Sequence, residues 1–559
     1  MIFATPPMGQ DLLQIAIEHY RAGRLAEAEA IYRQVLAENP NDADTHNNLG
    51  AVLRAAGRFD EAIESYRRAI QFKPDRPEGH YNLGNALKFK NQLDEAVECY
   101  QRAIDLKGDF SDAYNNLANV LAEQGRIDQA IAASRSAIRL KPDNPDYYVN
   151  LLYALYHHPE YDSRRILEET RQWSRRQGGG GATHFPARDR TRRRLKIGYL
   201  SPFFGMCADA HYILPLLAHH DRKQFEIFSY TRTIRDDELT ARLRPHCQHW
   251  HDLRRLRVAE SAELIRGHGI DILVNISRPA DVCQRIMANR LAPIQITWLT
   301  FASCTTGLET MDWRISDPYL DPAGSDECYA EKTLRLPRTA WCYDPLVDSP
   351  PVNPLPALAG GGLTFGSLNR LSKINPSVVA AWAQILRAVP NSRMLILAIP
   401  GSHRQRLLDQ FHQGSVDAGR IEFIDRQSRI DYLKQYGRID VTLDPFPFSG
   451  HTTTLDSLWM GVPVVTLSGG TCVGRASASA LHNLGMAEWI AQTPSQYVSL
   501  AVQFSKDVEK LAQVRAGLRQ RMRQSALTDA SRFALHMEEA YRQVWRQFLD
   551  GAQTPQSAD

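Results

Sequence analysis

A repeat with a period of 34 residues constrains the fold of the N-terminal part of this 559-residue chain. The repeat is visible at two sets of positions, Leu49, Leu83 and Leu117, and Ala62, Ala96 and Ala130. Thirty-four residues is the period of tetratricopeptide helix pairs. The same frame extends back to Ala28 and forward to Leu151, which makes four repeats and part of a fifth. Because one repeat cannot bury its own apolar face, the repeats must stack as an α-solenoid.

One polar position keeps step with this repeat. It is an asparagine directly before the repeated leucine position, at Asn48, Asn82, Asn116 and Asn150. A primary amide both donates and accepts hydrogen bonds, so a row of amides predicts a groove that holds an extended polypeptide by its backbone. The alternative is that these amides only satisfy polar groups between helices.

Beyond residue 194 the pattern changes to short apolar runs, many of them separated by stretches with helical periodicity. The runs include "LKIGYLS", "FEIFSYT", "IDILVNIS", "RMLILAI" and "PVVTL". This alternation indicates parallel α/β structure, with enough elements for two doubly wound, Rossmann-like domains. We therefore expect a solenoid at 1–176, a linker at 177–194, an N-terminal Rossmann-like domain at 195–347 and a C-terminal one at 363–550.

Bulk composition excludes several classes of protein. The formal net charge of +3, from 66 basic and 63 acidic residues, gives no argument for binding nucleic acid or an anionic membrane. The eight cysteines have no CxxC spacing, which favours reduced thiols over disulfides or a zinc site. No apolar run is long enough to span a bilayer, and the N-terminus lacks the basic region of a signal peptide. We expect a soluble, cytoplasmic protein that is not exported by a cleaved signal.

The stretch "DPFPFSGHTTTLDSLWMGVPVVTL", residues 444–467, places four polar side chains where a strand gives way to a helix. They are His451, Thr452, Thr453 and Thr454. A helix N-terminus attracts anions through its free N–H groups and its dipole, and open α/β sheets bind ligands at this edge. The run therefore predicts a phosphate seat. Ordinary capping of the helix is the alternative.

These motifs together resemble one family. The repeats, followed by "LKIGYLSPFF", "LAPIQITWL", "GSLNRLSKINP" and the stretch at 444–467, resemble the nucleocytoplasmic protein O-GlcNAc transferases and their SPINDLY-type O-fucosyltransferase relatives. The resemblance covers nearly the whole chain. It implies a GT-B fold and an inverting, metal-independent transfer of a sugar from a nucleotide diphosphate to Ser or Thr of a protein. No cofactor is implied, and UDP-GlcNAc is the first donor to consider.

The resemblance also assigns roles to residues. It implies that His451, Thr452, Thr453 and Thr454 cradle the donor phosphates and that Asp456 holds the ribose hydroxyls. It implies that Lys373 stabilises the departing diphosphate. By position, Gln427 and Arg429 are candidates for base and ribose contacts, and Tyr432 for stacking on the base. Ordinary helix-surface roles stay open for those three.

The sugar side departs from the family pattern. In "FFGMCADAHYILPLL", Cys207 stands where relatives have a histidine. If this segment is helical, His211 shares its face and reaches the same cleft, and Asp209 is a second candidate base. The segments "NISRPADV" and "TFASCTTG" also replace family motifs. The nucleotide side therefore looks intact, whereas the sugar side looks rebuilt.

Two hypotheses follow. The first is a protein O-glycosyltransferase whose solenoid captures its acceptor protein, with transfer to flagellin or another surface protein as one variety. The second is a catalytically inactive tetratricopeptide scaffold that retains a nucleotide-sugar fold. The loss of the family histidine favours the scaffold. Intact Lys373 and the intact "GHTTTLD" favour the enzyme, because drift would erode those polar positions too.

Overall fold

The computed structural model describes residues 8–177, 185, 194–299, 301 and 304–553. Most of the predicted linker at 177–194 lies outside these residues, as do parts of the "TFASCTTG" segment. The chain forms two compact units. One contains the residues up to Leu151 together with Ile399–Gln405, and the other contains Leu152–Ala398 and the remainder. Among the described helices, none has the length and apolar character needed to cross a membrane.

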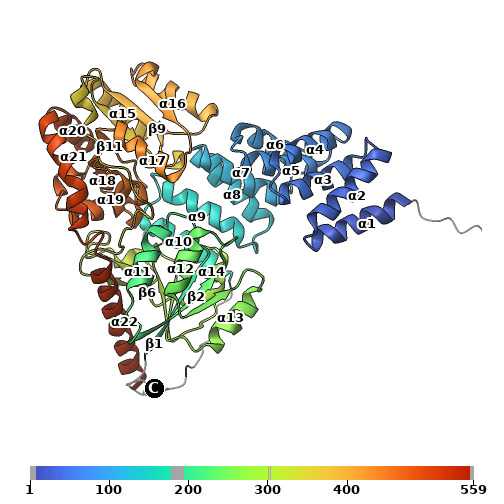
Figure 1. Cartoon of the computed structure of the whole chain (residues 1–559), viewed down its shortest axis with the longest axis horizontal. Helices are drawn as coiled ribbons and strands as arrows, with labels where there is room; N and C mark the ends of the chain where they lie inside the picture. Colours follow the sequence, from blue (N-terminus) through green and yellow to red (C-terminus); the bar gives the residue numbers. More distant parts are fainter. Residues whose placement is uncertain (1–7, 178–184, 186–193, 300, 302–303, 554–559) are drawn as a thin grey trace, which may run out of the picture. The chain divides into compact units, whose positions relative to one another are not determined.

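The first unit is an α-solenoid, as the 34-residue period predicts (Figure 1). Each helix from the first to the eighth packs against the next. Their bounds are α1 Met8–Arg21, α2 Leu25–Glu38, α3 Ala43–Ala55, α4 Phe59–Phe72, α5 Pro77–Phe89, α6 Leu93–Leu106, α7 Ser111–Glu123 and α8 Ile127–Leu140. The chain passes into the second unit within α9 (Asp146–His157), and α10 (Ser163–Arg175) follows there.

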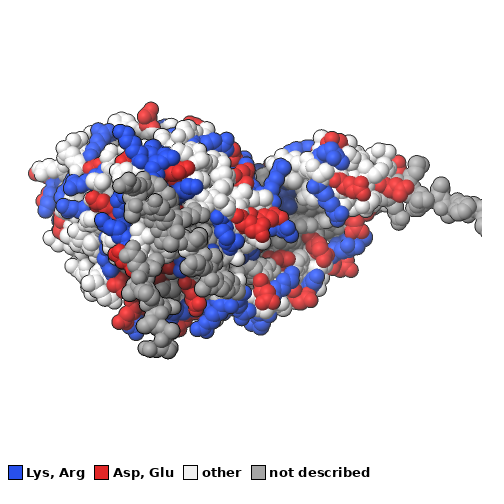
Figure 2. All heavy atoms as spheres, turned by 90° about the horizontal axis from the view of Figure 1, so that it is seen from below, with Lys and Arg blue, Asp and Glu red and all other residues white. Residues whose placement is uncertain are grey.

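Close helix contact explains the small residues of the repeat. Ala62 and Ala96 are completely buried. A Cβ atom on Gly84 would lie 2.8 Å from the ring of Tyr100, so only glycine fits there. Exposed ion pairs also link neighbouring repeats, for example Arg67 with Glu95 at 2.9 Å. On the face shown in Figure 2 basic and acidic side chains are interspersed, in line with the small net charge.

The second unit contains two parallel sheets, which confirms the doubly wound prediction. The first has the order β3-β2-β1-β4-β5-β6-β7 and the second β10-β9-β8-β11-β12-β13. The first-sheet strands are β1 Leu195–Ser201, β2 Phe225–Thr231, β3 His249–Asp252, β4 Ile272–Asn275, β5 Ile294–Thr297, β6 Trp313–Ser316 and β7 Lys332–Arg335. The second-sheet strands are β8 Thr364–Ser367, β9 Arg393–Leu397, β10 Ile421–Ile424, β11 Val441–Leu443, β12 Val464–Leu467 and β13 Ile490–Ala491.

Helices accompany both sheets. Those that follow first-sheet strands are α11 Ala210–His219, α12 Glu238–Leu243, α13 Val258–Gly267 and α14 Val282–Met287. Those in the second-sheet part are α15 Pro376–Ala388, α16 Ser402–Gln413, α17 Arg429–Gln435, α18 Thr452–Trp459, α19 Cys472–Asn483, α20 Pro494–Ser505 and α21 Val508–Arg523. The predicted limits of the four segments stay predictions.

The last helix, α22 (Ala530–Gln553), packs on α11 in the first-sheet part (Figure 1). The hydroxyl groups of Tyr541 and Tyr199 lie 3.0 Å apart, and Glu538 accepts a hydrogen bond from the backbone N–H of Asp221 at 2.8 Å. The predicted C-terminal domain included this helix. Its contacts are with α11 and β5 of the first-sheet part, a pairing that its amphipathic pattern alone does not specify.

The strand orders locate the place for a ligand. The order reverses between β1 and β4 in the first sheet and between β8 and β11 in the second. Ligands of open α/β sheets bind beyond the carboxyl ends of the strands at such points. The segments between these four strands and the next α-helix are 202–209, 276–281, 368–375 and 444–451.

Candidate functional site

A cavity of about 190 Å³ lies where these four loops meet. Asp209 and Arg278 reach it from the first-sheet part. The second-sheet part contributes Lys373, His451, Thr452 and Thr453, and the aromatic part of its wall is Tyr153, Phe301 and Phe448. The cavity thus collects five predicted residues from distant parts of the chain.

The turn before α18 is shaped for close contact. The backbone N–H of Gly450 donates to the buried carboxylate of Asp444 at 2.7 Å. A Cβ atom at Gly450 would lie 2.2 Å from the Thr454 hydroxyl, so a larger residue cannot fit. The N-cap residue is His451, and its side chain makes no capping hydrogen bond. The three threonines occupy the first helical turn, where backbone N–H groups lack partners within the helix.

The threonine hydroxyls point in different directions. Thr452 and Thr453 line the cavity. Thr454 is buried and turns away from it, toward α19. In chain order, the hydrogen-bond partners of the three hydroxyls are Tyr212 at 2.9 Å, Asn369 at 2.8 Å and Ser477 at 2.7 Å. The structure therefore brings two of the three threonines to the cavity.

Lys373 lies beside the turn that leads into α18. Its ammonium donates to the backbone carbonyl of Ser449 at 2.7 Å and lies 4.5 Å from the ring centre of Phe448. Burial lowers the pKa of Lys373 to about 8, although the nearby carboxylate of Asp444 opposes this shift. The amine is therefore a cation at neutral pH, held by a single neutral acceptor.

His451 is a neutral ring between aromatic neighbours. It stacks on Tyr212 with ring centres 4.5 Å apart and meets the edge of Trp341. Burial, together with the positive charge of Lys373, lowers its pKa to about 3. Its Nε2 atom is buried and has no hydrogen-bond partner among the described residues. A buried polar atom without a partner at a cavity wall is a natural contact for a ligand.

The segment after β1 does not have the geometry that would align Cys207 with His211. The helix α11 begins only at Ala210, with Asp209 as its N-cap residue, so Cys207 precedes it. The helical-face argument for His211 therefore fails. The Cys207 thiol donates to the backbone carbonyl of Phe203 at 3.4 Å, and burial raises its pKa to about 12.

His211 is buried outside the cavity wall. Its Nδ1 atom lies 2.5 Å from the backbone carbonyl of Asp344, and its ring stacks on Tyr343 with centres 5.5 Å apart. Burial lowers the pKa of His211, so the ring is neutral at neutral pH. The structure does not bring this residue together with Lys373.

Asp209, by contrast, lines the cavity with Lys373. Burial raises the pKa of its carboxyl group, whereas the positive charge of Arg278 opposes that shift. A carboxylate whose pKa is raised is a stronger proton acceptor than a solvated one. Of the two predicted bases, Asp209 is the one that faces the cavity.

The predicted nucleoside contacts lie apart from this cavity. Asp456 is buried and forms a two-pronged ion pair with Arg429, at 2.7 and 2.5 Å. The Tyr343 hydroxyl also donates to Asp456, at 2.5 Å. Burial would lower the pKa of Arg429, but the carboxylate more than offsets this and raises it. Both oxygens of Asp456 are therefore engaged within the protein.

Two further nucleoside candidates lie beside this pair. Gln427 is exposed and accepts a hydrogen bond from Gln435 at 3.0 Å. Tyr432 and Tyr436 share a hydrogen bond of 2.9 Å between their hydroxyl groups. The cavity wall includes neither Gln427 nor Tyr432.

Two arginines of the cavity were missed from the sequence. Arg278 follows β4 and Arg370 follows β8, and both line the cavity. The charged side chains of its wall are thus Arg278, Arg370 and Lys373 against one carboxylate, Asp209. Each arginine follows a strand at a reversal point of the sheet order, and these points are known only from the structure.

In the first unit, the asparagine row makes contacts between repeats. Asn82 donates to Asn47 at 2.9 Å, and Asn116 donates to Asn85 at 2.7 Å. In the next repeat, Asn150 donates to Asn115 at 2.9 Å. Asn48 is half-buried, like the others. These bonds fit the alternative interpretation of the row, and a role in peptide binding stays a prediction.

A larger cavity, of about 560 Å³, adjoins Tyr343. Its wall includes Leu214 of α11, Trp459 of α18 and Arg523 of α21, and none of the predicted site residues. The described residues contain no cluster of three or more metal-ligating side chains. Five of the predicted site residues therefore line the smaller cavity, and none lines the larger one.

Comparison with known proteins agrees with this arrangement. Residues 181–346 and 355–537 match the model of Glycosyl transferase family 41, and three segments within 13–163 match a tetratricopeptide repeat model. Over 368 residues the chain is 36% identical to the "Probable UDP-N-acetylglucosamine--peptide N-acetylglucosaminyltransferase SPINDLY" of Petunia hybrida. That match covers 64% of this chain and 39% of the relative.

One further relative and one solved structure also match the chain. The "UDP-N-acetylglucosamine--peptide N-acetylglucosaminyltransferase" of Caenorhabditis elegans is 25% identical over 476 residues, which cover 64% of this chain and 41% of that one. A solved mutant of the Thermobaculum terrenum O-GlcNAc transferase superposes with a TM-score of 0.78 at 32% identity. It covers 98% of this chain and 100% of its own. The chain thus spans about two fifths of the length of its curated relatives.

Proposed function

The chain belongs to glycosyl transferase family 41, and from this membership we propose that it is an inverting, metal-independent protein O-glycosyltransferase with a GT-B fold. It moves a sugar from a nucleotide diphosphate to Ser or Thr of a protein. The observation that carries the proposal is the meeting of Lys373, Asp209 and the N-terminus of α18 around one cavity. UDP-GlcNAc is the first donor to test, because the names of the relatives contain it.

The donor diphosphate sits at the N-terminus of α18. The free N–H groups of its first turn, the hydroxyls of Thr452 and Thr453 and the Nε2 atom of His451 offer it hydrogen-bond partners. Lys373 offsets the negative charge that grows as the bond between sugar and phosphate breaks. Stabilisation of charge as it develops is usually the largest single catalytic contribution.

Arg370 supplies a second positive charge on the same side. The cavity wall carries three cations and one carboxylate, while His451 is neutral. A metal-independent site must compensate a diphosphate with protein charges alone, and this surplus of cations suits that need.

Asp209 accepts the proton of the acceptor hydroxyl. In the inverting step, the oxygen of a Ser or Thr side chain attacks the anomeric carbon while the bond from that carbon to the phosphate oxygen breaks. The hydroxyl proton passes to the carboxylate of Asp209, and the nucleoside diphosphate leaves with the bonding electrons. General base catalysis of this kind contributes about 10²–10⁴-fold. His211, which is buried behind Tyr343, keeps the second place as a base.

Nucleoside binding requires a change at Asp456. Its carboxylate is buried and accepts three hydrogen bonds, two from Arg429 and one from Tyr343, so ribose hydroxyls reach it only where one of these contacts gives way. An arginine released in this way is available to the base or ribose, the role proposed for Arg429. Gln427 and Tyr432 are the further candidates for contacts to the base.

The repeats hold the protein acceptor. Asn48, Asn82, Asn116 and Asn150 retain amide hydrogen-bonding capacity beyond the bonds between repeats, so they can also meet a peptide backbone. We place the reaction in the cytoplasm, and flagellin or another surface protein is one class of acceptor to test.

Intact-mass analysis tests the proposal. Candidate acceptors are incubated with the protein and a panel of nucleotide sugars, and the mass increment identifies the sugar. The alternative function, an inactive scaffold, is favoured by Cys207 at the family histidine position and by the burial of His211. Absence of any increment across the panel, with nucleotide binding retained, would support the scaffold.

A further inference from the structure

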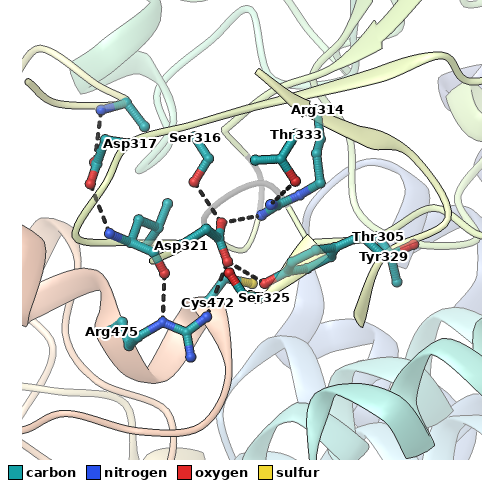
Figure 3. Close-up of polar contacts among 12 residues, drawn as sticks. Thr305, Arg314, Ser316, Asp317, Asp321, Ser325, Tyr329, Thr333, Cys472 and Arg475 are labelled. Carbon is teal, nitrogen blue, oxygen red and sulfur yellow. Dashed lines mark hydrogen bonds and ion pairs between the residues drawn. The ribbon is translucent and has the colours of Figure 1, made fainter. Parts of the chain in front are cut away.

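A buried ion cluster joins the first-sheet and second-sheet parts of the second unit, outside the cavity (Figure 3). Its centre is Asp321, which follows β6. One carboxylate oxygen lies 2.7 Å from Arg314 of β6, and the other lies 3.0 Å from Arg475 of α19. Arg314 and Asp321 are completely buried, and Arg475 is 9% exposed.

Asp321 is fully satisfied by its surroundings. The hydroxyls of Ser316 and Tyr329 each donate to it at 2.5 Å. Burial alone would raise the pKa of Asp321, but the positive charge of Arg314 and these hydrogen bonds hold it below its usual value. The carboxylate is therefore charged, and Arg475 approaches a fixed anion.

Arg475 contacts both parts of the unit at once. Its Nε donates to the backbone carbonyl of Leu320 at 2.6 Å, and its Nη1 donates to Gly469 at 3.2 Å. One turn further along α19, Ser479 donates to the buried carboxylate of Asp317 at 2.8 Å. The planar fork of arginine can make several such bonds in fixed directions, which a lysine cannot.

The same helix supports the turn that we assign to the diphosphate. Ser477 shares a hydrogen bond with Thr454 at 2.7 Å and donates to the carbonyl of Gly450 at 3.0 Å. Ser449 donates to the carbonyl of Val473 at 2.7 Å. Val473 also lines the cavity. The start of α19 therefore sets where the turn at 449–454 lies.

Lys373 depends on this arrangement as well. The acceptor of its ammonium is the backbone carbonyl of Ser449, the residue that α19 holds. A continuous series of contacts thus runs from Asp321 through Arg475 and α19 to Ser449 and Lys373.

We propose that Arg475 is a positioning residue for sugar transfer. By binding Leu320 and Asp321, it fixes α19, and with it the diphosphate turn and Lys373, relative to the first-sheet part that carries Asp209. This inference rests on the proposed function. The reaction needs donor and base in one fixed geometry, and a displacement of about 1 Å between them can cost about 100-fold in rate.

Four variants test the inference: Arg475→Gln, Arg475→Lys, Asp321→Asn and, as the matched control, Ser479→Ala. The control also removes a bond between α19 and the first-sheet part, but one helical turn beyond Arg475. For each variant we would measure the melting temperature, kcat, the donor KM and the dissociation constant of UDP. Hydrogen exchange of the peptide that covers 445–460 gives a readout that needs no activity.

The expected result is a split between catalysis and binding. In Arg475→Gln, kcat falls by about tenfold or more while the UDP dissociation constant changes by less than about threefold, because the diphosphate seat itself stays in the second-sheet part. Arg475→Lys regains part of the lost kcat, Asp321→Asn resembles Arg475→Gln, and Ser479→Ala stays near wild type. Exchange at 445–460 rises in Arg475→Gln and not in Ser479→Ala.

Three results would overturn the inference. One is a folded Arg475→Gln protein with kcat within about twofold of wild type. Another is an equal loss of kcat and UDP affinity in every variant, which would indicate a purely structural role. The third is unchanged exchange at 445–460. If Arg475→Gln does not fold, kcat and the UDP dissociation constant of Arg475→Lys and Asp321→Asn are compared with those of Ser479→Ala. A kcat in both variants as high as in Ser479→Ala would then overturn the inference. If the wild-type protein transfers no sugar, the proposed function fails, and the exchange measurement still judges the positioning role.

Discussion

Lys373 and Ser449 are joined by a hydrogen bond of 2.7 Å from the ammonium to the backbone carbonyl. The acceptor, Ser449, stands two residues before His451, which is the N-cap residue of α18. A charge and a helix N-terminus therefore face the same cavity from fixed positions. The relationship makes definite predictions about catalysis and binding.

Replacing Lys373 with methionine should reduce turnover much more than nucleotide affinity. The charge that it offsets grows as the glycosidic bond breaks, so the interaction strengthens toward the transition state. We expect kcat to fall by about 100-fold or more, as for the loss of other transition-state donors. Parallel measurement of kcat and of UDP affinity by calorimetry checks this. Equal factors for the two would make Lys373 a binding residue only.

The pH dependence should report the same group. Because burial lowers the pKa of Lys373 to about 8, the unliganded protein loses this cation as the pH rises through 8. We expect kcat/KM for the donor to fall as the pH rises through this value. In Lys373→Arg the guanidinium remains charged, so this alkaline decline should disappear even if the rate is lower. A decline that persists in Lys373→Arg would assign the titration to another group.

The assignment of Asp209 as the base predicts different effects for substitutions at three residues in or near α11. Asp209→Asn should lower kcat by about 100-fold or more, within the range of general base catalysis. Cys207→Ala should stay near wild type, because a thiol with a pKa of about 12 is protonated at neutral pH. His211→Ala should act mainly through lost packing on Tyr343. Rate measurements on folded variants decide, and an active Asp209→Asn beside an inactive His211→Ala would return the role to His211.

The contributions of Asp456 and of the diphosphate-binding turn before α18 should be distinguishable by comparing two ligands, UDP and pyrophosphate. Asp456→Asn should weaken the binding of UDP, because a carboxylate accepts hydrogen bonds from ribose hydroxyls more strongly than an amide. Inhibition by inorganic pyrophosphate, which has no ribose, should change little. The matched control is Thr452→Val, for which pyrophosphate inhibition should weaken too. If Asp456→Asn weakens both ligands alike, Asp456 supports the site as a whole and does not contact the ribose.

The asparagine row should matter for protein acceptors only. Combining Asn82→Ala with Asn116→Ala should lower modification of a full-length acceptor while UDP binding stays near wild type. Both amides also bridge repeats, so the melting temperature must be measured as well. If UDP binding falls in step with acceptor modification, the substitutions have damaged the solenoid, and the acceptor role is not supported.

Features that depend on local sequence were predictable. The solenoid follows from one period, and the turn at 450–454 from one short motif, because neighbouring residues determine both. Thr454 shows the limit of this approach, since its hydroxyl belongs to Ser477 of the next helix. Thr452 and Thr453 line the cavity and Thr454 does not, and this difference is visible only once the positions of α18 and α19 are known.

Features that depend on distant contacts were not predictable. Arg278 and Arg370 meet at the cavity only because two different sheets face each other. The helical-face argument for His211 failed because α11 begins at Ala210, after an irregular loop that the apolar pattern does not reveal. The pairing of Arg475 with Asp321 joins residues far apart in the chain, and neither stands in a motif.

The central claim is that this cavity transfers a sugar from a nucleotide diphosphate without a metal, and intact-mass analysis of an acceptor tests it most directly. The acceptor is incubated with each donor of the panel in the presence of EDTA, once with the wild-type protein and once with Lys373→Met. We predict a mass increment of one sugar residue with the wild-type protein and at least one donor, and its loss in Lys373→Met. No increment with any donor, or an equal increment in both proteins, would contradict the claim.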